Sequence, residues 1–272
     1  MSMLDFAIMA TTEYIDHMPK SQRKKYGQFF TSKETAIFMA ELFEIPNGCE
    51  VLSILDPGAG SGILSIALLE RLQSFSVIKE IRLVCYENDP NIMELLRTNL
   101  ETACSYSQQE ISYEIVPDNY ILSQSNDYNL MLGANLNPEK FDFIIGNPPY
   151  MKIAKNTPEA LAMPDVCYGA PNLYFLFASM SLFNLKDDGE MVYIIPRSWT
   201  SGAYFKRFRQ KFLNEGALEH IHLFVSRDKV FEKESVLQET IIIKLKKTHL
   251  KPKTITITTT QSNADFSEKT IF

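Results

Sequence analysis

Four consecutive residues have the clearest chemical potential in the chain: Asn147, Pro148, Pro149 and Tyr150. They follow the apolar run 141–146, which is typical of a buried strand. Proline has a fixed φ and no N–H, and the residue before it is restricted to extended geometry. The side-chain oxygen of Asn147 and the carbonyl of Pro148 could then accept both protons of an exocyclic amino group, with Tyr150 stacking on the ring. The plainer alternative is a proline-stiffened loop with a solvent-exposed tyrosine.

A glycine-rich turn, Asp-Pro-Gly-Ala-Gly-Ser-Gly, occupies residues 56–62 between an expected strand and an expected helix. Glycines allow the backbone to approach a ligand closely, and a helix N-terminus offers free N–H donors. The G-x-G-x-G spacing differs from the G-x-G-x-x-G of nicotinamide dinucleotide sites, which disfavours that cofactor. The turn alone fits several classes of nucleoside-binding protein.

Two further strand ends have acidic side chains. Glu87 could accept hydrogen bonds from both hydroxyls of a ribose, although an acid at a helix N-terminus is the alternative. Asp118, beside Asn119, could accept from an adenine amino group, although Asp-Asn also makes simple turns. Because ligands bind at the carboxyl ends of strands in open parallel sheets, Asp56, Glu87, Asp118 and Asn147 should share one rim.

Strands and helices alternate along most of the chain, which predicts an α/β fold with a mostly parallel sheet covered on both faces. Strands are expected at 51–55, 81–86, 112–116, 141–145, 191–195, 221–225 and 238–245. Helices are expected at 3–17, 33–43, 62–72, 90–102, 173–184 and 204–213, with Thr31 or Ser32 capping the second. The alternating threonines and isoleucines of 254–260 indicate either the first strand of a further region or a disordered tail.

The net charge of −6 on 272 residues argues against a surface coated for nucleic acid, so any such contact must be local. Basic residues are concentrated in two places, each of which could equally be a solvated face: Lys20, Arg23, Lys24 and Lys25; and Arg197, Lys206, Arg207, Arg209 and Lys211.

Four scattered cysteines and the lack of a signal-peptide pattern predict a cytoplasmic protein with free thiols. His220 and His222 would share one face of a strand, but they have no thiol or acidic partners in sequence. No metal site and no membrane contact are therefore expected.

Together these motifs resemble those of S-adenosylmethionine-dependent DNA adenine-N6 methyltransferases, in the group whose N-terminal cofactor motif precedes the glycine-rich turn. The resemblance covers roughly residues 20–247 and includes the segment 27–31, Gly-Gln-Phe-Phe-Thr. It implies a Rossmann-like, doubly wound, mostly parallel sheet of seven strands. The segment 172–175 is similar to the family's helix beside the cofactor pocket, although its aromatic residues could simply be core.

The resemblance also implies a role for each matching residue. The cofactor S-adenosylmethionine would be bound by Thr31, Asp56, Pro57, Gly58, Gly60, Gly62, Glu87, Asn88, Asp118, Asn119, Asn147 and Pro149. The catalytic residues would be Asn147, Pro148, Pro149 and Tyr150, and Tyr150 and Phe231 would contact a base flipped out of the duplex. Phe231 is equally compatible with a place in the core.

The implied domains are an N-terminal helix (1–20), a catalytic domain (21–248) and the start of a truncated target-recognition region or a tail (249–272). The implied partners are DNA and a restriction endonuclease or specificity subunit. Two other hypotheses stay open. One is methylation of glutamine N5 in a protein or guanine N2 in RNA, and the other is a non-catalytic nucleotide- or DNA-binding subunit.

Overall fold

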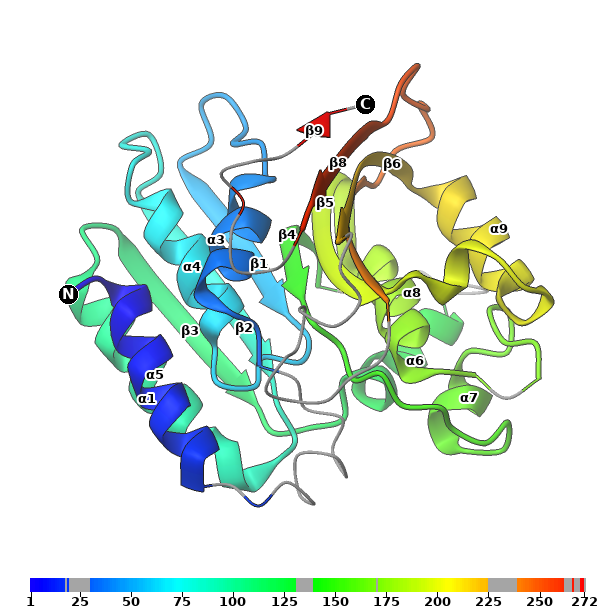
Figure 1. Ribbon diagram of the computed structural model, residues 1–272, viewed down its shortest axis with the longest axis horizontal. Helices are drawn as coiled ribbons and strands as arrows, with labels where there is room; N and C mark the ends of the chain where they lie inside the picture. The colour runs from blue at the N-terminus through cyan, green and yellow to red at the C-terminus, as the bar shows by residue number, and fades with distance from the viewer. Residues whose placement is uncertain are drawn as a thin grey trace.

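The computed structural model describes residues 1–17, 19, 30–130, 139–169, 171–224, 239–261, 266 and 270–271. The strands are β1 (Val51–Asp56), β2 (Glu80–Tyr86), β3 (Glu110–Val116), β4 (Phe141–Gly146), β5 (Leu185–Pro196), β6 (Ala217–Phe224), β7 (Thr240–Lys246), β8 (Thr256–Thr260) and β9 (Thr270–Ile271). They form one sheet in the order β3-β2-β1-β4-β5-β7-β6-β8-β9, as Figure 1 shows for most of its width.

The first five strands of the sheet are parallel, and β7 runs antiparallel between β5 and β6. This arrangement confirms the α/β, mostly parallel fold and all seven expected strands. Two strands extend the sheet beyond that expectation. The Thr/Ile alternation forms β8, which pairs in parallel with β6, and β9 pairs with β8. The segment therefore continues the same sheet; its place in a recognition region stays a prediction.

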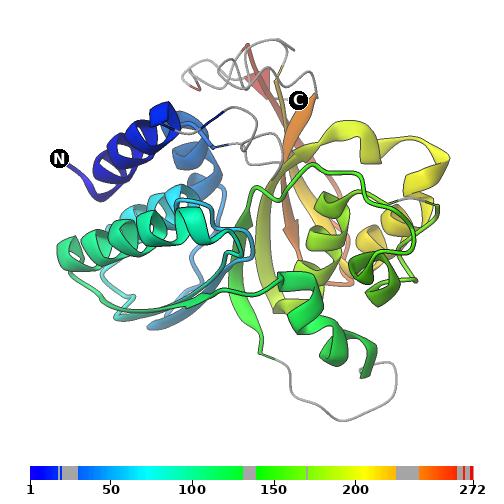
Figure 2. The same cartoon turned by 90° about the horizontal axis from the view of Figure 1, so that it is seen from below.

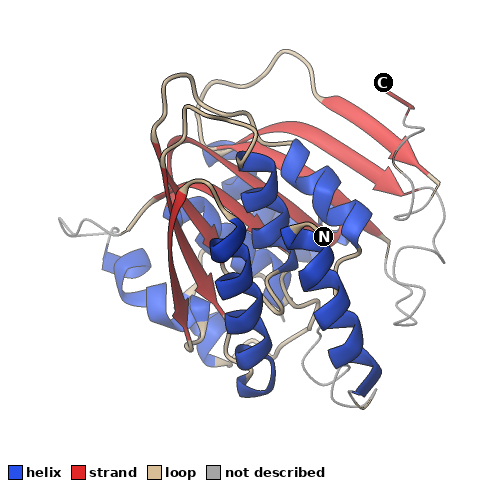
Figure 3. Cartoon of the chain, turned by 90° about the vertical axis from the view of Figure 1, so that its left-hand side faces the viewer, coloured by secondary structure: helices blue, strands red, loops and turns tan. Residues whose placement is uncertain are grey.

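Helices cover both faces of the sheet. One layer contains α1 (Met3–His17), α3 (Lys33–Glu41), α4 (Ile63–Leu72) and α5 (Pro90–Tyr106). The other contains α6 (Tyr120–Leu130), α7 (Pro158–Ala162), α8 (Leu173–Asn184) and α9 (Lys206–Glu215), with short 3-10 turns η1 (Arg197–Thr200) and η2 (Ala203–Phe205) before α9. Figure 2 shows the two layers on opposite sides of the strands, and in Figure 3 the first layer lies in front of them.

The six expected helices are present, and Ser32 rather than Thr31 caps α3, its hydroxyl accepting from Thr35 N at 3.3 Å. Two helices, α6 and α7, were not expected. Helix α6 buries only Tyr120, Ile121 and Tyr128, and so few apolar positions do not repeat at helical spacing in its sequence. Within the described residues, no helix is both long and apolar enough to span a bilayer.

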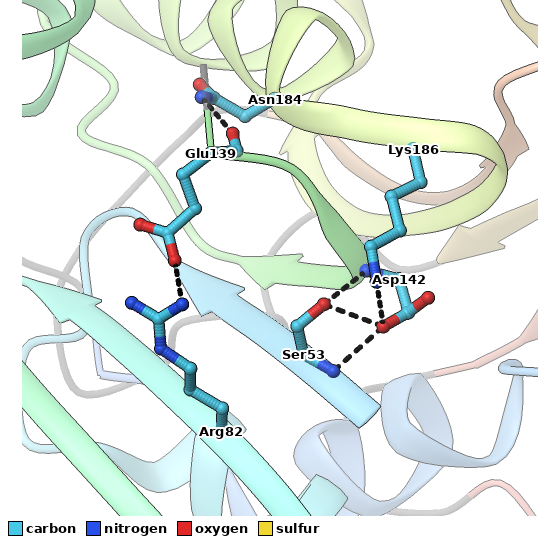
Figure 4. A network of polar contacts seen from close by, with 6 residues as sticks. All are labelled: Ser53, Arg82, Glu139, Asp142, Asn184 and Lys186. Atoms are coloured by element: carbon cyan, nitrogen blue, oxygen red, sulfur yellow. Dashed lines mark hydrogen bonds and ion pairs between the residues drawn. The ribbon is translucent and has the colours of Figure 1, made fainter. Parts of the chain in front are cut away.

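A polar network joins the neighbouring strands β1 and β4 (Figure 4). Both the N–H and the hydroxyl of Ser53 donate to Asp142 Oδ2, at 2.8 and 2.6 Å, and Lys186 Nζ donates to the same oxygen at 2.8 Å. Burial opposes ionisation of Asp142, but these donors outweigh it and hold the pKa of the carboxyl below its usual value. The network supports the register in which Leu55 faces Ile144.

A buried ammonium group on β7 links this strand to its two neighbours, β5 and β6. The Lys244 side chain is only 5% exposed, and its Nζ lies 2.9 Å from Glu44, 3.1 Å from Glu190 and 3.2 Å from Glu219. These three glutamates place carboxylate oxygens within 4.8 Å of one another, as a metal site would, but the lysine supplies the compensating charge. Glu190 is also buried and accepts from Glu44 N at 2.8 Å.

We expect Lys244→Met to destabilise the fold by roughly 3–5 kcal/mol near pH 8, because it leaves the Glu190 carboxylate buried without its cation. Burial already raises the pKa of Glu190. A raised carboxyl pKa means stability that is present at low pH and lost as the pH rises, so the deficit should shrink near pH 5. Urea unfolding at both pH values measures this. Adding Glu190→Gln should restore part of the loss; an equal deficit at both pH values would contradict the explanation.

Candidate active site

A crevice of about 270 Å³ opens at the carboxyl ends of β1 to β4, where the chain leaves each strand. It brings together most of the residues predicted from the sequence. Those that line it are Thr31, Pro57, Gly58, Gly60, Glu87, Asn88, Asp118, Asn119, Asn147 and Pro149. Leu173 also lines it, whereas the neighbouring Tyr174 and Phe175 are buried in the core. Three of the four residues expected on one rim, Glu87, Asp118 and Asn147, therefore line one crevice, and Asp56 does not.

The glycine-rich turn is shaped by two glycines with left-handed backbone. Gly60 has φ +55° and Gly62 has φ +84°, values that L side chains rarely adopt. A Cβ on Gly62 would also lie 2.9 Å from Leu96 Cδ1, so this glycine permits the close packing of α4 on α5. Gly62 lies behind the crevice lining rather than in it.

Glu87 is held in place by main-chain donors. Its Oε2 accepts from Gly60 N and its Oε1 from Asp89 N, both at 2.8 Å. Burial raises the pKa of Glu87, and these hydrogen bonds oppose that rise. The N-cap of α5 is Asp89, which accepts from Asn91 N at 3.0 Å, so capping that helix is not the role of Glu87. Its fixed carboxylate faces the crevice and can accept from ribose hydroxyls.

The third strand end has a bridge that the sequence did not indicate. Asn119 accepts from Leu122 N at 3.2 Å, which begins α6, and donates from Nδ2 to Glu159 Oε1 at 2.9 Å. Glu159 lies on α7, forty positions away in sequence, and lines the crevice beside Asp118. An acid in the first turn of a five-residue helix offers no sequence signal for such a role.

Asn147 lines the crevice and is half-buried, with hydroxyl groups at both ends of its amide. Its Nδ2 donates to Thr31 Oγ1 at 3.2 Å, and its Oδ1 accepts from the Tyr150 hydroxyl at 2.7 Å. Thr31 belongs to the N-terminal motif, so that motif reaches the amide directly. Pro149 lines the crevice, whereas Pro148 is buried outside the lining.

Tyr150 is packed into the protein beside the crevice. The residue is 8% exposed, its hydroxyl also lies 2.9 Å from the Ile194 carbonyl, and its ring meets Tyr174 edge-on at 6.4 Å. Burial raises the pKa of this phenol well above its ordinary value. The alternative of a solvent-exposed tyrosine is therefore wrong. Stacking on a substrate stays a prediction, and the ring does not line the crevice.

Several other candidates lie elsewhere. Phe231 and the first basic cluster lie outside the described residues. In the second cluster, Arg197 pairs with Glu239, Arg209 donates to the carbonyls of Trp199 and Ser201, and Lys211 pairs with Asp165. These cations are engaged with the protein itself.

The two strand histidines are also structural. His220 lies 2.8 Å from Thr258 Oγ1, and His222 lies between Thr258 and Thr260, at 2.8 and 3.0 Å. Their ring nitrogens thus join β6 to β8.

Asp56 is buried below the turn and does not line the crevice. Its Oδ2 accepts from Ser65 Oγ at 2.7 Å. Burial raises the pKa of Asp56 to about 7, despite hydrogen bonds from Ser65 and the Gly58 N–H that lower it. Its described contacts are those of a residue that shapes the turn; contact with a cofactor stays a prediction.

The described lining contains four carboxylates, Glu87, Asp89, Asp118 and Glu159, and no lysine, arginine or histidine. A nucleoside with a cationic substituent suits this field, whereas a pyrophosphate would be repelled. S-adenosylmethionine combines an adenosine with a sulfonium cation, and the residues present fit it: acids for the ribose and adenine, and a glycine turn for close approach.

The strand order with an antiparallel β7 and this acidic crevice define a class I S-adenosylmethionine-dependent methyltransferase fold. Residues 72–231, more than half of the chain, match the model of the Eco57I restriction-modification methylase family. The chain belongs to this family, and its cofactor is S-adenosylmethionine.

Relatives and solved structures agree with this assignment. The Type II methyltransferase M.BsuBI of Bacillus subtilis is 37% identical over 229 residues, 83% of this chain and 44% of its own. M.PstI of Providencia stuartii is 35% identical over 247 residues, which are 88% of this chain and 46% of M.PstI. This chain thus spans slightly less than half the length of these relatives.

Two solved structures share the fold. One, from Listeria monocytogenes, is described as a class I S-adenosylmethionine-dependent methyltransferase. It has a TM-score of 0.64 at 18% identity and covers 87% of this chain and 67% of its own. The other is the methyltransferase subunit of a type I restriction-modification system from Streptococcus thermophilus. It has a TM-score of 0.61 at 18% identity, and the match covers 85% of this chain and 47% of that subunit.

We expect Asp56→Asn to flatten the pH dependence of stability. A carboxyl whose folded pKa is raised to about 7 stabilises only while protonated, so its contribution is lost as the pH rises through that value. The free energy of unfolding should fall by up to about 1.4 kcal/mol per pH unit between about 4 and 7 in the wild type, and by less in the variant. Denaturant titrations across this range measure it; parallel curves for the two proteins would contradict the prediction.

Proposed function

We propose that this protein transfers a methyl group from S-adenosylmethionine to the exocyclic N6 of adenine in DNA, as part of a restriction-modification system. The observation that carries the proposal is the position of the Asn147 amide. It lies in the same crevice as Glu87 and the glycine-rich turn, between Thr31 and Tyr150. The family and its Type II methyltransferase relatives support DNA as the substrate.

The chemistry follows from the weakness of the nucleophile. The lone pair on adenine N6 is delocalised into the ring, so the amino group must be drawn toward tetrahedral geometry before it can react. Asn147 Oδ1 and the Pro148 carbonyl accept hydrogen bonds from its two N–H groups and localise the lone pair. The nitrogen forms its bond to the methyl group as the sulfur–methyl bond breaks, and it then loses one of these protons to solvent. When bound, the cofactor supplies the methyl group as an electrophile. The protein contributes positioning and acceptors aimed at the charge that develops on nitrogen.

The target base must leave the double helix to reach this site, at a cost of a few kcal/mol. Aromatic stacking can recover about 1–3 kcal/mol of this, and Tyr150 and Phe231 are the candidates for it. A restriction endonuclease that recognises the same sequence would be the functional partner, and methylation would protect the host DNA from it.

We expect Asn147→Ala to lower kcat for DNA methylation by at least 100-fold, because it removes one acceptor of the amino protons. Cofactor affinity should change little, since Glu87 and the turn are intact. Transfer of labelled methyl groups to unmethylated genomic DNA, with mass spectrometry of the nucleosides, gives both rate and product. Isothermal titration gives the affinity for S-adenosylmethionine.

Asn129→Ala is a matched control, because this exposed asparagine on α6 is outside the crevice lining. It should retain wild-type activity. Near-normal turnover by Asn147→Ala would remove the proposed mechanism. Methylcytosine, methylguanine or a methylated protein as the product of the wild type would remove the proposed substrate.

The hydroxyl and the ring of Tyr150 can be tested separately. Tyr150→Phe removes the hydrogen bond to Asn147 Oδ1, worth about 0.5–1.5 kcal/mol, and should reduce kcat roughly two- to tenfold. Tyr150→Ala also removes the buried ring and should destabilise the fold by roughly 3–5 kcal/mol. Methyl-transfer assays measure the effect on kcat, and thermal unfolding measures the effect on stability. A Tyr150→Phe enzyme with wild-type kcat would mean that the hydroxyl does not position the amide.

A further inference from the structure

The segment after the catalytic tetrapeptide, residues 151–159, begins and ends at the crevice and is called the rim segment here. Met151 and Glu159 both line the crevice. The first part is fixed by a short ladder to the segment before α8. Lys152 pairs with Asn172 as an isolated bridge, Ile153 N donates to the Pro171 carbonyl, and Leu173 N donates to the Met151 carbonyl, both at 2.8 Å.

Two lysines of the segment are exposed: Lys152, within the ladder, and Lys155, which follows it. Within the part of the chain that the structure describes, neither ammonium group forms an ion pair or a side-chain hydrogen bond. Two cations of α9, Arg207 and Lys211, differ in this respect. Arg207 donates to the carbonyls of Pro164 and Cys167, and Lys211 pairs with Asp165.

The charges of the rim and the crevice are opposite. The described crevice lining is acidic and the chain carries a net charge of −6, so DNA phosphates are repelled from most of the surface. The two exposed lysines lie between the lining residues Met151 and Glu159, and their charge provides local compensation where a strand must approach for its base to enter. An acidic crevice beside a basic segment suits a substrate with an uncharged base and a polyanionic backbone.

We propose that Lys152 and Lys155 contact backbone phosphates of the DNA strand that carries the target base, next to the flipped nucleotide. This inference rests on the proposed function and adds to it the site of strand contact. Phosphate contacts fix position without reading sequence, so these lysines act equally on all target sequences. They are positioning residues, and their effect should appear in DNA affinity and its salt dependence.

The test compares two double variants with the same change in net charge. Lys152→Gln/Lys155→Gln removes the rim lysines. The control, Lys79→Gln/Lys253→Gln, removes two exposed lysines that precede β2 and β8, at the edge of the sheet opposite the crevice. Methylation of sheared, unmethylated genomic DNA is measured over a range of KCl concentrations, and S-adenosylmethionine affinity is measured by titration calorimetry.

For the rim variant we expect KM for DNA at about 0.1 M salt to rise on the order of tenfold, with kcat and cofactor affinity unchanged. The slope of log affinity against log salt should fall in magnitude by about 1.8, since each phosphate contact contributes about 0.9. The control should keep the wild-type slope. Equal salt-dependence slopes for the two variants, or a loss of cofactor affinity in the rim variant, would overturn the proposal for these lysines but leave the proposed function standing. A wild-type protein that does not methylate DNA would overturn the proposed function and this inference with it.

Discussion

The pairing of β1 with β4 is the constraint on which the site depends. The chain runs outward through β2 and β3 and returns to place β4 on the other side of β1. Ligands bind at such a switch point because the loops diverge and leave a crevice. Because Leu55 pairs with Ile144, the glycine-rich turn that follows β1 and Asn147 that follows β4 lie at the same height along the strand direction. A slip of one residue would turn Asn147 to the other face, and the Ser53–Asp142 contact opposes it.

Main-chain donors hold one acid of the crevice, Glu87, in a fixed position. Glu87 accepts one main-chain hydrogen bond from each of two loops. These bonds link the turn after β1 to the start of α5. Burial raises the pKa of that carboxyl, and the main-chain donors oppose the rise. The same acids that suit a sulfonium cation would repel a phosphate. Under the proposed function, the two substrates therefore approach through surfaces of opposite charge.

The sequence predicted the strands and their shared rim because both follow from local pattern and a general rule. Apolar runs mark buried strands, and the carboxyl ends of parallel strands converge, which places Glu87, Asp118 and Asn147 together. It did not predict what depends on distant packing. Glu159 reaches Asn119 only through the tertiary fold, the burial of Tyr150 depends on β5, and the alternation in β8 does not specify β6 as its partner.

The proposed acceptor role of Asn147 requires an amide whose orientation is fixed, as the contacts with Thr31 and Tyr150 provide. A carbonyl oxygen has two lone pairs, and the Tyr150 hydroxyl occupies one of them. That hydroxyl has one proton and a second acceptor within reach, the Ile194 carbonyl, so it stays hydrogen-bonded in either orientation. The buried phenol can thus adjust to a change at the amide oxygen without being left unsatisfied, a loss that would cost about 1–3 kcal/mol.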